Sequence, residues 1–222
     1  MSVLSGPRFG PTAGGRAQGL VVLCHGVGSD GDDLISLAPM LAAKLPNIVF
    51  ASPHGPEPYD MAPSGRQWFS LADRRLAPME AGVRMADQAL SRYIDVLLAE
   101  LHLPATAYAL AGFSQGAMVA LFTGLRRASA PRAILAYSGM LLGPDRLAEE
   151  MANHAPVLMV HGEQDEVVPA NMSRMGAKVL ERSGVPTRLV LRPELGHSID
   201  SAGVAEGVAA LAKAFASPAP AA

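Results

Sequence analysis

The sequence predicts an α/β fold in which a mainly parallel central sheet is flanked by helices. Short runs that are apolar at almost every position recur along the chain, and such runs are typical of strands covered on both faces. Longer segments between them carry apolar residues at every third or fourth position, the spacing of helices with one buried face. Strands that alternate with helices along one chain favour a parallel sheet.

Six runs are expected to be strands and five segments to be helices. In order, the expected strands are Leu20–Cys24, Ile48–Ala51, Tyr108–Ala111, Ala133–Tyr137, Val157–Val160 and Arg188–Leu191. The expected helices are Leu34–Leu45, Glu80–Leu101, Gln115–Arg127, Pro169–Ser183 and Ser201–Phe215. The helical spacing is longest in the second of these, where the apolar positions are Val83, Ala86, Leu90, Ile94, Leu97 and Leu101.

Two parts of the chain lack these patterns. Residues 52–79 are rich in Pro, Gly and Ser and hold the only Trp, so we expect a structured loop there and a candidate cover for a site. No break in composition marks a second domain, so residues 1–216 are expected to form a single domain. The tail 217–222, S-P-A-P-A-A, is expected to be disordered.

The composition excludes several classes of protein. Half of the residues are hydrophobic and 17% are charged, which excludes wholesale disorder. The formal charge is −2 and no basic block is present, so nucleic-acid binding is not expected. Cys24 is the only cysteine in the sequence, so a disulfide within the chain is excluded. No apolar run is long enough for a membrane span, and the first residues do not resemble a signal peptide. We therefore expect a cytoplasmic protein.

The strongest motif is G-F-S-Q-G, in which Ser114 lies between Gly112 and Gly116. It falls where an expected strand ends and an expected helix begins, the context of a nucleophile elbow. There a tight, strained turn projects the serine hydroxyl above the sheet, at the positive end of a helix. In this context the motif predicts a catalytic serine instead of a chance match.

A nucleophilic serine needs a base, and the base needs an acid that orients it. Asp165 and His197 follow two later expected strands, in the chain order Ser, Asp, His. Because parallel strands end at one edge of a sheet, the three side chains are expected to meet there. Other candidates are less suitable. Glu163 and Glu166 could replace Asp165, but their longer side chains hold an imidazole less rigidly. His25 and His161 are expected to be structural. The remaining histidines lack a suitable acid; they are His54, His102 and His154.

The glycine-rich loop H-G-V-G-S-D-G has two interpretations. Gly26, Gly28 and Gly31 match the G-x-G-x-x-G pattern of dinucleotide-binding loops, but no acid ends the next strand to hold a ribose. The alternative interpretation is an oxyanion hole, which needs two backbone N–H donors. One donor is the amide of Gln115, directly after the serine, and the other is most plausibly the amide of Val27.

Together, H-G-V-G, W-F, G-F-S-Q-G, H-G-E-Q-D-E-V-V-P and G-H resemble the phospholipase/carboxylesterase family of α/β-hydrolases, which includes the acyl-protein thioesterases. The resemblance runs from about Leu20 to Phe215 and is strongest to bacterial members. It implies an α/β-hydrolase fold without a large cap domain, and a serine esterase that acts on carboxylic esters, lysophospholipids or acyl thioesters. It implies no cofactor and no metal, and members are often homodimers.

Position by position, the family pattern implies a triad of Ser114, Asp165 and His197. It also implies an oxyanion donor at Val27, a position where thioesterase members usually carry Leu. It also places a W-F element near the acyl pocket, which makes Trp68, Phe69 and Leu71 candidate substrate-binding residues. Trp68 and Phe69 have an alternative role as core anchors of a long loop.

Three other functions are weighed against the esterase. A dienelactone-hydrolase-like enzyme would need a cysteine nucleophile, but Cys24 does not lie on the elbow. A ligand-binding protein with a hydrolase fold would be favoured by a broken triad, whereas all three members are present. The nucleotide-dependent oxidoreductase lacks the ribose acid. Acyl length, and the choice between ester and thioester, depend on loop geometry that motifs do not determine.

Overall fold

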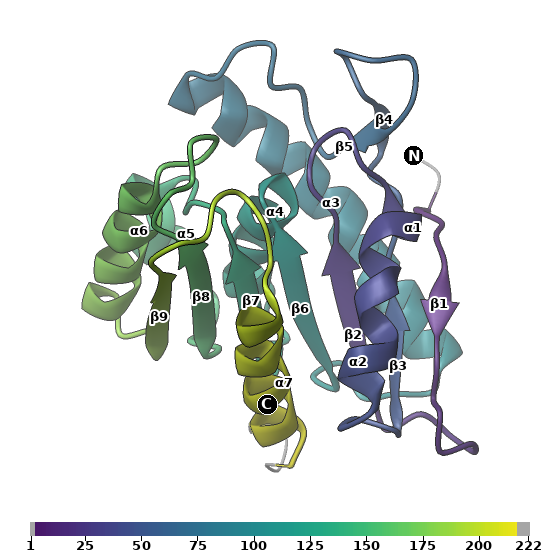
Figure 1. Cartoon of the computed structure of the whole chain (residues 1–222). Helices are drawn as coiled ribbons and strands as arrows, with labels where there is room; N and C mark the ends of the chain where they lie inside the picture. The colour runs from purple at the N-terminus through teal and green to yellow at the C-terminus, as the bar shows by residue number, and fades with distance from the viewer. Residues whose placement is uncertain (1–2, 217–222) are drawn as a thin grey trace.

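The computed structural model describes residues 3–216, and within them seven strands form one sheet in the order β1-β3-β2-β6-β7-β8-β9 (Figure 1). All neighbouring strands are parallel except the edge pair β1–β3. The strands are β1 (Arg8–Phe9), β2 (Gly19–Cys24), β3 (Ile48–Ala51), β6 (Tyr108–Phe113), β7 (Ile134–Tyr137), β8 (Val157–Gly162) and β9 (Thr187–Arg192). The predicted α/β fold with a mainly parallel sheet is confirmed.

Helices cover both faces of the sheet, and each face has its own apolar core. On one face lie α3 (Leu76–Glu100), α4 (Gln115–Arg126) and α6 (Ala170–Arg182), packed on side chains such as Leu110 and Met159. On the other face lie α1 (Gly31–Leu34), α2 (Ala38–Ala42) and α7 (Ser201–Ala216), drawn in front of the sheet in Figure 1. None of the helices within residues 3–216 combines the length and apolar character that crossing a membrane requires.

All six expected strands form, with ends shifted by at most two residues. The expected helix Leu34–Leu45 is instead broken into α1, a 3-10 turn (Ile35–Leu37) and α2. Pro39 accounts for this break, because it has no N–H to continue the hydrogen-bond ladder and is accommodated only near the start of α2. α3 begins four residues before the expected Glu80, because a first turn also tolerates the proline at position 78.

Short elements were not expected from the sequence. β1 and the hairpin strands β4 (Glu57–Pro58) and β5 (Arg66–Gln67) have two residues each, too few to show a period. The 3-10 turn Pro144–Arg146 and α5 (Leu147–Glu150) are similarly short. The expected loop 52–79 is therefore structured by a hairpin and ends in the first turn of α3. The predicted disordered tail 217–222 lies outside the described residues.

Candidate active site

Ser114 lies on a strained turn between β6 and α4. Its backbone has φ +54° and ψ −117°, a conformation that L residues rarely adopt. The crossing of strand and helix requires glycine on both sides. A Cβ at position 112 would lie 2.3 Å from the carbonyl oxygen of Gly116, and one at position 116 would lie 2.0 Å from that of Cys24. The Ser114 side chain makes no cap hydrogen bond to α4, so its hydroxyl is available for another partner.

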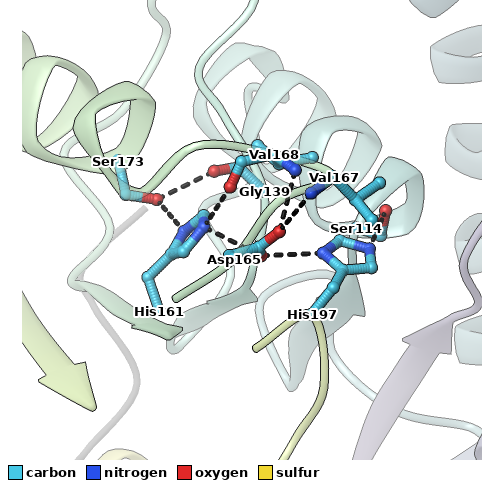
Figure 2. Close-up of polar contacts among 8 residues, drawn as sticks. All are labelled: Ser114, Gly139, His161, Asp165, Val167, Val168, Ser173 and His197. Carbon is cyan, nitrogen blue, oxygen red and sulfur yellow. Dashed lines mark hydrogen bonds and ion pairs between the residues drawn. The ribbon is translucent and has the colours of Figure 1, made fainter. Parts of the chain in front are cut away.

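That partner is His197, in the loop between β9 and α7. The Ser114 Oγ lies 2.9 Å from His197 Nε2, and His197 Nδ1 lies 2.7 Å from Asp165 Oδ2 (Figure 2). The three residues come from loops after β6, β8 and β9, and the ends of these strands are nearly level, with Phe113 beside Tyr137 and Gly162 beside Arg192. The structure therefore brings together the three side chains that the sequence singled out.

Asp165 is held as an ionised acceptor. Its side chain is buried, which acts to raise the pKa, but hydrogen bonds from His197 and from the backbone amides of Val168 and Val167 outweigh burial. The net result is that the pKa of Asp165 lies below its usual range. The two amides bind Oδ1 at 2.9 and 2.8 Å, which leaves Oδ2 for His197.

The loop that carries His197 is pinned by a charged pair at its ends. The Arg192 side chain, at the end of β9, bonds the Asp200 carboxylate at 3.0 Å through Nε and 2.9 Å through a terminal nitrogen. Asp200 in turn accepts the amide of Gly203 at 2.7 Å in the first turn of α7. The pair thus fixes both ends of a short loop whose centre must present an imidazole to Ser114. Sequence reasoning did not identify this clamp.

The glycine-rich loop lies beside the elbow and is held by buried hydrogen bonds. His25 Nδ1 lies 2.7 Å from the Gly26 carbonyl oxygen, and His25 Nε2 accepts the Gly55 amide at 2.8 Å. Burial lowers the pKa of His25, which fits a neutral ring in this structural role. Among the described residues, no acceptor is found for the backbone amides of Val27 and Gln115. Both amides are therefore free to bind an anionic oxygen.

The side chain of Gln115 clamps the W-F segment to the elbow. Its Oε1 accepts the Trp68 amide at 2.9 Å and its Nε2 donates to the Phe69 carbonyl at 2.7 Å. The Trp68 indole donates to the His25 carbonyl at 2.9 Å. The Trp68 and Phe69 side chains are 1% and 2% exposed, a placement that fits the core-anchor alternative, whereas Leu71 is only partly buried.

We expect Gln115→Leu to destabilise the protein by about 2–6 kcal/mol. A leucine of similar size leaves the Trp68 amide and the Phe69 carbonyl buried without partners, and each such loss costs roughly 1–3 kcal/mol. Urea unfolding measures the change. The control is Gln18→Leu, at an exposed glutamine, which should shift stability by less than about 0.5 kcal/mol. Equal midpoints for the two variants would show that the clamp contributes nothing.

The remaining candidates lie apart from the Ser114–His197 pair or are otherwise engaged. Glu163 is ion-paired with Arg174, and Glu166 is exposed. His54 accepts the Gly31 amide, and the thiol of Cys24 is buried in β2, which raises its pKa well above the usual range. A buried, low-reactivity thiol does not fit the dienelactone-hydrolase-like alternative.

The α/β-hydrolases have a mainly parallel sheet that is covered on both faces. Their serine lies on a strained strand–helix turn, and their histidine and aspartate lie on later loops, as in this structure. The family model for Phospholipase/Carboxylesterase matches residues 12–213. The chain belongs to this family and is a carboxylic ester hydrolase.

Curated relatives and solved structures agree with this assignment. The chain is 28% identical over 188 residues to esterase YpfH of Escherichia coli (strain K12), covering 83% of this chain and 78% of that protein. It is 28% identical over 202 residues to acyl-protein thioesterase 1 of Neurospora crassa, covering 82% and 81% of the two chains. The crystal structure of esterase PE8 superposes with a TM-score of 0.91 at 38% identity, covering 96% of this chain and 99% of that one.

Proposed function

We propose that Ser114 is the nucleophile of a two-step acyl transfer, with His197 as general base and acid and Asp165 as its orienting partner. The observation that carries the proposal is the hydrogen-bond chain from Asp165 Oδ2 through His197 to Ser114 Oγ, which ends at the strained elbow. The chain is intact, which argues against a ligand-binding protein with a broken triad.

In the first step, the Ser114 oxygen attacks the ester carbonyl carbon and its proton passes to His197 Nε2. The carbonyl oxygen becomes an oxyanion, for which the unpaired amides of Val27 and Gln115 supply two donors. The intermediate then expels the leaving oxygen, His197 Nε2 protonates it, and an alcohol departs. An acyl-enzyme ester on Ser114 remains.

In the second step, a water molecule attacks the acyl carbon and gives a proton to His197 Nε2. Collapse of the second intermediate breaks the bond to Ser114 and returns that proton to its oxygen, so a carboxylic acid leaves and the enzyme is regenerated. Asp165 stays ionised throughout, because its low pKa favours the carboxylate, and it stabilises the imidazolium form of His197.

For the substrate, we propose a small oxygen ester, with an acyl thioester as the second candidate. The first is supported by the 38% identity to an esterase over nearly the whole chain, and the second by the thioesterase name of the Neurospora crassa relative. Trp68 and Phe69 are buried and therefore act through the loop they anchor. Leu71 is the residue of this segment that we propose to line the acyl site.

We expect the purified protein to hydrolyse p-nitrophenyl butyrate with a higher kcat/KM than the matched thioester S-(4-nitrophenyl) thiobutyrate, in which only the leaving atom differs. Matching the acyl chain isolates the leaving atom, because both substrates pass through the same acyl-enzyme. Preference for the thioester would replace the first candidate by the second. Hydrolysis of neither substrate by folded protein would favour a ligand-binding role.

A cytoplasmic location and a homodimer are further proposals. The location is supported by the single, buried and unpaired cysteine, which fits a reducing compartment. Size-exclusion chromatography with light scattering measures the oligomeric state.

A further inference from the structure

A second histidine lies against Asp165, on the side away from His197 (Figure 2). His161 is near the end of β8, four residues before Asp165, and its side chain is fully buried. Nothing in the acyl-transfer steps uses this ring. Its place beside the orienting carboxylate nevertheless brings it into contact with the site.

The contacts of His161 Nε2 determine where that nitrogen carries a proton. Nε2 lies 2.8 Å from the carbonyl oxygen of Val168, which can only accept a hydrogen bond. Nε2 must therefore be protonated, and this nitrogen also lies 3.1 Å from Asp165 Oδ2. Oδ2 thus has a ring nitrogen from each of two histidines within 3.1 Å, while Oδ1 accepts the backbone amides of Val167 and Val168.

The other ring nitrogen fixes the plane of the imidazole. His161 Nδ1 lies 2.6 Å from Ser173 Oγ on α6, and Ser173 lies 2.8 Å from the carbonyl oxygen of Gly139. Gly139 lies two residues after Tyr137, which is the last residue of β7. The carbonyl oxygen of Tyr137 accepts the Ser114 amide at 2.8 Å. Because Ser173 is also buried, the ring is held from both nitrogens within the protein interior. A side chain fixed in this way can impose an orientation on its neighbour.

We propose that His161 is a positioning residue, which orients the Asp165 carboxylate toward His197 through its Nε2–H. This inference rests on the proposed role of Asp165. Rotation of the carboxylate about its last bond would misdirect Oδ2, and small displacements in such a relay cost up to about 100-fold in rate. A donor on the far side of Oδ2 opposes that rotation without touching substrate.

The test compares His161→Gln with His161→Asn. The two amides have the same chemistry, but the glutamine NH₂ reaches the position of Nε2, whereas the asparagine NH₂ reaches only that of Nδ1. We expect His161→Asn to lower kcat about 10- to 100-fold with KM changed less than about twofold, and to slow fluorophosphonate labelling of Ser114 by the same factor. His161→Gln should stay within about threefold of wild type. Equal losses in both variants would overturn the proposal in favour of simple packing.

His154→Asn, at an exposed histidine before β8, is the matched control and should keep wild-type kcat. If the His161 variants do not fold, ¹⁵N-histidine NMR of the wild-type protein tests the same claim, because Nε2 of His161 must carry a proton. An unprotonated Nε2 would contradict the proposal. A wild-type protein that neither hydrolyses esters nor labels at Ser114 refutes the proposed function. Full activity of His161→Asn beside a labelled wild type refutes only the role of His161.

Discussion

Replacing Ser114 by alanine should lower the turnover of p-nitrophenyl butyrate by about a million-fold, the loss seen when a serine hydrolase loses its nucleophile. The substitution removes the only atom that can form the acyl-enzyme. It leaves the elbow backbone, the two free amides and the His197–Asp165 hydrogen bond in place. Initial rates at saturating substrate measure the effect, with active-site titration of the wild type to set the scale.

The alanine variant should be about as stable as the wild type. The backbone at position 114 is expected to keep φ +54° with either serine or alanine, so the melting temperature should change little. Ser183→Ala, after α6, is the matched control and should keep full activity. Retention of more than about a thousandth of the wild-type rate by Ser114→Ala, with no wild-type contamination, would mean that another group performs the attack.

Replacing Asp165 by asparagine should lower kcat about ten-thousand-fold, as the same change does in a serine protease triad. The carboxylate accepts hydrogen bonds from His197 and from the amides of Val167 and Val168, whereas an asparagine must present an NH₂ group in place of one oxygen. If that NH₂ group faces His197, Nδ1 must accept a hydrogen bond from it and be unprotonated. The proton of the neutral ring then sits on Nε2, where it blocks transfer from Ser114. Asp145→Asn, at an exposed aspartate, is the control.

The same variant should change how stability depends on pH. The folded-state pKa of Asp165 is lowered, so its contribution is fully present above the unfolded pKa of about 3.9 and is lost as the pH falls through the folded value. The stability difference between wild type and Asp165→Asn should therefore be largest near neutral pH and shrink in acid. Urea unfolding at several pH values measures it, and a difference that grows below pH 4 would contradict the assigned shift.

The sequence was sufficient for the sheet because most of the long strands are apolar at almost every position, which is a strong local signal for burial on both faces. It also predicted that Ser114, Asp165 and His197 lie together, as they do in the structure, because their positions follow three strands and parallel strands end at one edge. It failed for β1 and for the hairpin strands β4 and β5, because two residues are too few to show a strand period. The break in the helix after Leu34 follows from Pro39. The apolar spacing continues through the break and therefore predicts one unbroken helix.

The supporting contacts around the site could be anticipated only in part. His161 was assigned a structural role, and its spacing of four residues from Asp165 was the available sign that the two side chains meet. The clamp made by the Gln115 side chain had no such sign, because Trp68 and Phe69 lie almost fifty residues away in the chain. The Arg192–Asp200 pair joins two loop ends whose separation depends on the course of the backbone.

The most direct test of the central claim is the intact mass of the protein after treatment with a fluorophosphonate, followed by peptide mapping. We expect one adduct per chain, on Ser114, and almost none in His197→Ala, because only a serine paired with that imidazole is activated. An adduct on a different residue, or no adduct on folded protein that hydrolyses esters, would contradict the assignment of Ser114 as the nucleophile.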